Sequence, residues 1–274
     1  EICACLVGSE MCIRDSPYIE RNPAYDEEES GGSVKGDQAV TDRHGRLYTL
    51  DEILLGTPAG GLGRGITSIE WPSAYNVGST FVDAVGTQIT ARVFKSAEMK
   101  AVTDDERFFA ENPALSAQIQ GICPYGWHIA NFRDWYDLAY AALEASRGDG
   151  TYPVREEMLT IAKLVATNAN NVAPWLRTQE GWNSTPARAA GADAFDFNLY
   201  PTGWRLNKNG YGQYGDTAHS WVPLIGSSAK KTWRLNNVKA TSNYWFNDNL
   251  DAGNPAVGIR CVKNYKVCLL YTSP

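Results

Sequence analysis

Apolar residues recur at helical spacing in two stretches near the middle of the chain. In 131–146 they follow the spacing i, i+3, i+4, i+7 and i+8: Trp135, Leu138, Ala139, Ala142 and Leu143. Asn131 is the expected N-cap, and Asp134 adds an acid to the first turn. The second stretch, about 154–168, carries a similar stripe behind Pro153. We expect two amphipathic helices that dock on a core.

The other regular patterns favour short strands. Between 87 and 94, Ile89, Ala91 and Val93 alternate with polar neighbours, which predicts a half-buried strand. After Asn170, short aromatic-rich segments are separated by Asn, Gly and Asp, a pattern typical of small strands and long structured loops. The glycine-rich stretch 56–65 lacks the Lys-Ser/Thr ending of a phosphate-binding loop, so we interpret it as an ordinary surface loop.

The two ends of the chain resemble no fold. "LVGSEMCIRDS" (6–16) and "CLLYTSP" (268–274) are similar to translated sequencing-library adapter, so we interpret 1–16 and 267–274 as adapter-derived. Residues 17–39 are acidic and punctuated by Gly and Ser, as in a linker, and 40–266 form one domain.

Removing the two ends changes the formal net charge from −6 to −4, because Glu1, Glu10, Asp15 and Arg14 are lost. A mildly acidic chain is a poor partner for nucleic acid or an anionic membrane, both of which attract basic surfaces. The visible chain also contains no apolar run long enough to predict a membrane span.

Only Cys123 and Cys261 remain of the six cysteines once the ends are excluded. The chain is rich in Asn, Gly, Thr, Ser and aromatic residues and has few charges, as proteins that face the outside often are. A disulfide between the two cysteines is therefore the leading interpretation, with unpaired buried thiols as the alternative. Catalysis by Cys123 would need a base, and His128 follows across a turn that points it elsewhere.

Two further polar groupings contain residue types that occur in catalytic sites. His128 lies between Trp127 and Ile129 with no orienting acid in the residue pattern, so we interpret it as a structural histidine. Asp216, His219 and Ser220 stand within five residues, and triad members that close in sequence rarely face one another. We therefore predict no catalytic residue.

Oxygen-bearing side chains gather in "WFNDNLDAGN" (245–254). The side chains that could hold Ca²⁺ are Asn247, Asp248, Asn249 and Asp251. Their spacing does not fit an EF-hand loop, and a polar turn between strands is the alternative interpretation. The sequence predicts no other metal ion and no cofactor.

Four motifs occur in an order that resembles the Fibrobacter succinogenes major paralogous domain: "GICPYGWHIANFRDWYDL" (121–138), "FDFNLYPTGWR" (195–205), "HSWVPL" (219–224) and "VGIRCVKN" (257–264). The resemblance implies a C-type-lectin-like α+β fold, similar to that of formylglycine-generating enzymes. Two helices would pack on small antiparallel sheets, with a long loop-rich second half. The resemblance also implies an exported protein at the extracellular or outer-membrane surface. A lipid anchor would require an N-terminal segment outside this chain.

Three functions fit this resemblance. The leading one is a non-enzymatic surface module that binds a glycan or a cell-surface protein through the loops of 204–254. Its candidate ligand-binding residues are Trp204, Tyr211, Tyr214, Trp221, Trp233, Asn247 and Asp248. The second is a structural repeat unit of a larger surface assembly. The third, a formylglycine-generating-type oxidase, needs two cysteines that bind copper, whereas we expect Cys261 to pair with Cys123.

Overall fold

Helices and small antiparallel sheets make up the computed structural model of the chain. It describes residues 47–48, 78, 80–92, 94, 96–146, 160–164, 176–183, 196–205, 211–212, 215, 217–223, 233–239 and 257–265. The expected α+β class is confirmed for this part of the chain. The predicted adapter-derived ends 1–16 and 267–274, and the predicted linker 17–39, lie outside the described residues.

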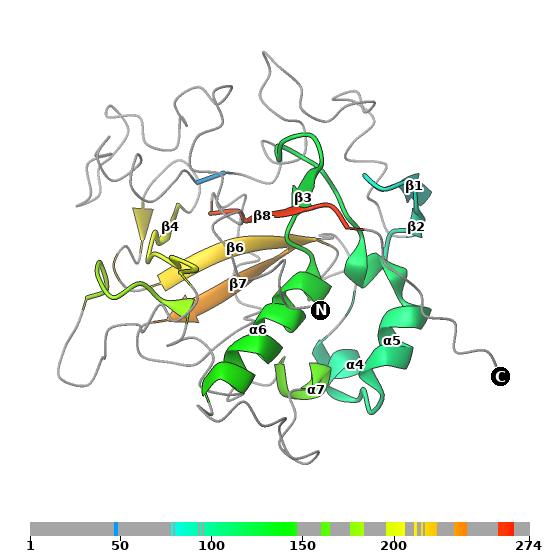
Figure 1. The fold of residues 1–274 in the computed structure, drawn as a ribbon, viewed down its shortest axis with the longest axis horizontal. Coiled ribbons are helices and arrows are strands. Elements are labelled where there is room, and N and C mark those ends of the chain that lie inside the picture. The colour runs from blue at the N-terminus through cyan, green and yellow to red at the C-terminus, as the bar shows by residue number, and fades with distance from the viewer. Residues whose placement is uncertain are drawn as a thin grey trace.

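Four antiparallel strand pairs are present among these residues. They join β1 (Thr80–Val82) to β2 (Gln88–Thr90), β3 (Trp127–Ile129) to β8 (Cys261–Lys263), β4 (Trp204–Arg205) to β5 (Tyr211–Gly212), and β6 (Thr217–Pro223) to β7 (Trp233–Lys239). The helical elements are α4 (Ser96–Lys100), α5 (Asp105–Glu111), η4 (Pro113–Ser116), α6 (Phe132–Ser146) and α7 (Ile161–Leu164). Figure 1 shows α4, α5 and α7 grouped on one side of α6, and β4 on the other.

The first predicted helix is confirmed. Helix α6 starts directly after Asn131, whose side-chain oxygen accepts the backbone N–H of Asp134 at 3.0 Å. Trp135, Leu138 and Ala139 are buried as the apolar stripe predicts. The second predicted helix is described only over Ile161–Leu164, where α7 buries both end residues.

The predicted strand between 87 and 94 is described as β2 and the residues that follow it. Ile89 and Ala91 are buried, while Gln88 and Thr90 are exposed, so the expected alternation is confirmed there. Position 93 lies outside the described residues. The β1–β2 pair thus covers the core with one face and leaves the other to solvent.

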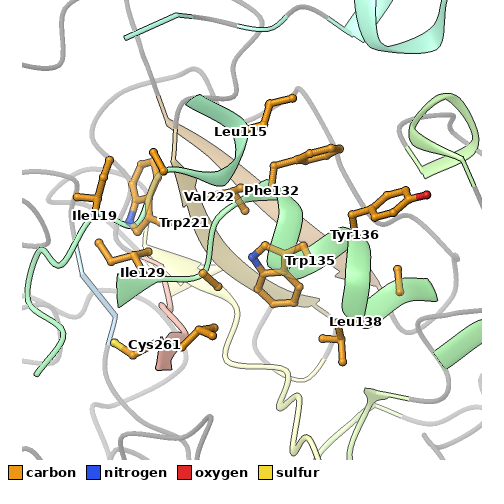
Figure 2. Packing of buried hydrophobic residues seen from close by; sticks show 14 of the residues in the cluster. Leu115, Ile119, Ile129, Phe132, Trp135, Tyr136, Leu138, Trp221, Val222 and Cys261 are labelled. Carbon is orange, nitrogen blue, oxygen red and sulfur yellow. The ribbon is translucent and has the colours of Figure 1, made fainter. Parts of the chain in front are cut away.

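A single apolar cluster joins the helices to the strands. Figure 2 shows Phe132 and Trp135 of α6 in the same interior as Trp221 and Val222 of β6, with Cys261 of β8 at its edge. Trp135 is 1% exposed, and its ring meets the edge of Phe197 at a centroid distance of 5.9 Å. Because Phe197 belongs to the loop-rich half, the two halves share one core.

Residues from both ends of the described chain close this core. Tyr48 forms an antiparallel bridge with Val257, and the Trp221 backbone N–H donates to the Gly258 carbonyl at 3.1 Å. A β-carbon at position 258 would lie 2.9 Å from the His219 carbonyl oxygen, so only glycine permits this approach. The segment that leads into β8 thus pairs with β6 through the Ser220–Gly258 bridge, and β8 itself pairs with β3.

Candidate functional site

A disulfide joins Cys123, in the turn before β3, to Cys261, the first residue of β8. The two Cα atoms are 5.8 Å apart, a normal separation for a disulfide, and both side chains are buried. In the β3–β8 register Cys261 lies opposite Ile129. The structure thus agrees with the leading interpretation of the two cysteines, and neither is present as a thiol.

His128 is the centre of a buried polar network. Its ring is 0% exposed, with Nδ1 3.0 Å from Asn264 Oδ1 and Nε2 3.0 Å from Asp134 Oδ2. The expectation that no acid orients His128 was wrong. The acid is Asp134, which the helical pattern had marked only as a first-turn residue of α6. Only two residues separate β3 from α6, so the first turn of the helix places this carboxylate beside the histidine.

Asp134 also organises the start of α6. Its Oδ2 accepts the Asn131 backbone N–H at 2.8 Å, which completes a reciprocal capping box with the Asn131 side chain. Its Oδ1 accepts the Tyr265 hydroxyl at 2.9 Å. With His128, three donors therefore surround one buried carboxylate, and such full hydrogen bonding is what makes a buried charge tolerable.

Tyr265 closes the network from the far end of the chain. Burial, together with the Asp134 charge, raises the pKa of its phenol above the ordinary value. The edge of the Tyr265 ring meets the His128 ring at 5.5 Å, and the Gln118 side-chain amide bonds both the backbone oxygen (2.6 Å) and the backbone N–H (2.9 Å) of Tyr265. The Gln118 side chain thus makes the two hydrogen bonds to the Tyr265 backbone that a neighbouring β-strand would otherwise make.

This arrangement serves the fold. A hydrogen-bonded His-Asp pair could in principle act as a base with its orienting acid, but a base needs a ring nitrogen that faces the substrate. Both ring nitrogens of His128 already meet oxygen atoms of the protein, and the ring has no exposed surface. The interpretation of His128 as a structural histidine agrees with this geometry.

The second polar grouping lies on β6. His219 Nε2 is 2.8 Å from Thr217 Oγ1, and both residues are buried. Ser220 follows His219 in the strand, and successive strand residues point to opposite faces of a sheet. The two side chains therefore do not form a nucleophile and base. Asp216 lies outside the described residues.

Trp221 requires a correction as a ligand-binding candidate. Its side chain is 4% exposed, and its indole N–H donates to the Tyr48 carbonyl at 2.9 Å. A ring so enclosed offers no face for a ligand, because it packs within the shared core (Figure 2). The aromatic pattern could not separate it from a surface ring, since both kinds of residue occur in the same short strands.

The other candidates differ in what the structure describes. Trp204 is half-buried in β4 and packs against the core. The backbone of Tyr211 lies in β5 and that of Trp233 in β7. The remaining predicted ligand-binding and calcium positions lie outside the described residues: Tyr214, Asn247, Asp248, Asn249 and Asp251. Within the described ranges, no group of three or more His, Cys, Asp or Glu side chains is placed to hold a metal ion.

An exposed loop in the second half was missed by the pattern analysis. Gln179, Glu180, Gly181 and Asn183 are exposed there, and the ring of Tyr200, a half-buried residue, lies against Gly181. The sequence contains one sign of this loop: the glycine between a charged and an aromatic residue in "TQEGWN". It indicates a turn but does not reveal which ring covers it.

These features define a disulfide-linked α+β domain in which Cys123 and His128 support the structure. The chain belongs to the family of the Fibrobacter succinogenes major domain, whose model matches residues 10–263. The resemblance inferred from the motifs is thereby confirmed. The match also includes the predicted linker and part of the stretch interpreted as adapter. No curated protein and no solved structure matches the chain. Over the described residues, no helix combines the length and apolarity that crossing a bilayer requires.

Proposed function

We propose that this domain is a non-enzymatic module of an exported or cell-surface bacterial protein, and that it binds a glycan through its loop-rich second half. We further propose that its α+β arrangement is C-type-lectin-like, on the strength of the motif resemblance. The observation that carries the proposal is the Cys123–Cys261 disulfide, which links residues 138 positions apart.

The disulfide supports export because such bonds persist in oxidising compartments and are rare in the cytosol. A bridge that closes so long a loop stabilises the folded state by about 4–5 kcal/mol on the chain-entropy model. Here it ties the turn before β3 to β8, which holds the C-terminal part of the network around His128. The protein gains this stability only where the cysteines can oxidise.

The buried network supports a binding role over a catalytic one. A copper-dependent oxidase of the formylglycine-generating type would need two cysteine thiolates, whereas both cysteines of the domain are joined to each other. His128 and Asp134 are likewise committed to one another. The polar and aromatic groups of the second half, in contrast, include exposed side chains that a ligand could reach.

Two measurements test this proposal. In protein recovered from a bacterial periplasm, alkylation and mass spectrometry should find Cys123 and Cys261 bridged, and reduction should lower the melting temperature. A glycan array followed by titration should find binding that Asp248→Ala weakens. The matched control is Arg107→Ala on α5, an exposed position of the helical half that should leave binding unchanged. Two free thiols would contradict the proposed export, and binding lost only in the control would contradict the proposed location of the site. Binding of a defined protein and of no glycan would show that the ligand is a protein.

A further inference from the structure

We propose that residues 257–265 form a strap that the Cys123–Cys261 disulfide holds closed, and that reduction of this disulfide lets the strap detach while α6 stays folded. The inference goes beyond ligand binding, because it concerns how the fold responds to its redox environment. It rests on the proposed export in one respect only: the strap is locked in the compartment where the cysteines oxidise.

The strap contacts parts of the chain that are distant from it in sequence. Val257 forms a bridge with Tyr48, and the Gly258 carbonyl accepts the Trp221 backbone N–H at 3.1 Å. Further along the strap, β8 pairs with β3, beside which it lies in Figure 1. The strap is the last part of the chain that the structure describes. Its detachment therefore carries no other described element with it.

The disulfide that locks the strap is enclosed when the strap is closed. Cys123 is 0% exposed and Cys261 is 2% exposed. Reduction by a dithiol breaks the S–S bond through thiolate attack, leaves two cysteine thiols and converts the reductant into a disulfide. In a closed reduced domain both thiols stay enclosed and meet no reagent. Their reaction with iodoacetamide therefore measures how often the strap opens.

Polar contacts hold the far end of the strap once the bridge is broken. The Tyr265 hydroxyl donates to Asp134 Oδ1 at 2.9 Å, and the Gln118 side chain bonds the Tyr265 backbone. The Asn264 backbone N–H donates to the Gly126 carbonyl at 2.7 Å. Water replaces such bonds when the strap opens, so each contributes little net free energy. Without the covalent link, we expect the strap to open before the rest of the core.

Helix α6 keeps contacts that do not involve the strap. The Trp135 ring meets the edge of the Phe197 ring at 5.9 Å, and the Tyr136 hydroxyl donates to Asp105 Oδ2 at 2.7 Å, which ties α6 to α5. Detachment removes Tyr265 from the buried network and admits water to it, but these contacts remain. The strap and α6 are therefore expected to open separately in the reduced protein.

The strap gives the disulfide a role in the timing of folding. Disulfides are rare in the reducing cytosol and persist in oxidising compartments. Before export the strap is held by its polar and apolar contacts alone, and oxidation after export locks it. The last step of folding thus takes place outside the cytosol.

Hydrogen exchange of the full chain tests whether the strap is a separate unit. Oxidised protein and protein reduced with dithiothreitol are compared by mass spectrometry, with rates corrected for the intrinsic exchange of each peptide. In the reduced protein, hydrogen-bonded amides of 257–265 should exchange about tenfold faster than those of α6, or more. In the oxidised protein the bridge prevents separate opening, so the two sets should agree within about threefold.

Two tyrosine variants with matched chemistry test the contacts of the strap. Tyr265→Phe removes a phenol hydroxyl bonded to Asp134, and Tyr136→Phe removes one bonded to Asp105, away from the strap. In reduced protein freed of dithiothreitol, Tyr265→Phe should speed the labelling of Cys123 and Cys261 by iodoacetamide about fivefold. Tyr136→Phe should leave the labelling rate unchanged.

The outcomes separate this inference from the proposed function. If the strap and α6 exchange at the same rate in the reduced protein, the domain opens as one unit and the strap proposal is wrong. Equal gains in labelling from both tyrosine variants, or no gain from Tyr265→Phe, would contradict it as well. Each of these results leaves export and glycan binding standing. Two free thiols in periplasmic protein would instead overturn the proposed export and leave the opening of the strap as measured.

Discussion

The start of α6 and the loop 178–183 use similar residues in opposite ways. Around α6, His128, Asn131 and Asp134 are buried and bonded to one another. In the loop, Gln179, Glu180 and Asn183 are exposed, and the loop is held mainly by backbone bonds and by Thr178. Polar side chains hold the first region together from within, whereas the second is held mainly by backbone hydrogen bonds and its polar side chains lie at the surface.

Removing the disulfide should cause the largest loss of stability in the region around the start of α6. Cys123→Ala combined with Cys261→Ala should lower the free energy of unfolding by about 4–5 kcal/mol. The reason is that the unfolded chain regains the freedom that a long cross-linked loop denies it. Urea unfolding of the double variant and of the oxidised protein measures the difference. A change below about 1 kcal/mol would show that the fold does not depend on the bridge.

Replacing the buried Asp134 carboxylate should cause the second-largest loss of stability. Asp134→Asn replaces an acceptor that serves three donors, so the free energy of unfolding should fall by about 3 kcal/mol. Tyr265→Phe is the matched control, because it removes one of these donors and keeps the ring against His128; it should cost about 1 kcal/mol. Equal losses in urea unfolding would contradict the view that Asp134 holds the network together.

A pH dependence should arise from Asp137 on the outer side of α6. Burial raises its pKa from 3.8 to about 6, an effect that the nearby Arg133 guanidinium only partly offsets. The folded state therefore binds this proton more tightly than the unfolded state. The stability that Asp137 contributes is fully present below about pH 4 and is lost as the pH rises through about 6.

Asp137→Asn should remove this loss. Between pH 4.5 and 7.5 the unmodified protein should lose about 1–3 kcal/mol more than the variant in urea unfolding. Burial also raises the pKa of Asp105, so both proteins keep a smaller dependence of the same sign. Parallel pH profiles for the two proteins would contradict the assignment to Asp137.

The smallest effect on stability should come from breaking an exposed ion pair. Arg107 and Glu111 form an i, i+4 ion pair on α5 with a distance of 2.8 Å, and both side chains are largely exposed. Water and salt screen such a pair, so Arg107→Ala should leave the urea midpoint unchanged. A clear loss of stability would show that surface charges contribute more to the helical region than the buried network suggests.

The sequence by itself determined the local features of this protein. The spacing of apolar residues predicts α6, and the Asn131 cap places its start, because helix periodicity and capping depend on residues only a few positions apart. The alternation at Ile89 and Ala91 predicts a strand face in the same way. The two internal cysteines, once the ends are set aside, leave one possible disulfide.

Only the tertiary structure decided which distant groups meet. Gln118 bonds Tyr265 across 147 residues, and Tyr265 reaches Asp134 across 131. No periodicity carries such pairings, since they depend on where β8 returns to the core. The same is true of Trp221, which the aromatic pattern offered to a ligand and the core encloses. Tyr200 came to lie on Gly181 for this reason too: their contact is made by the packing of two loops, and neither loop encodes it alone.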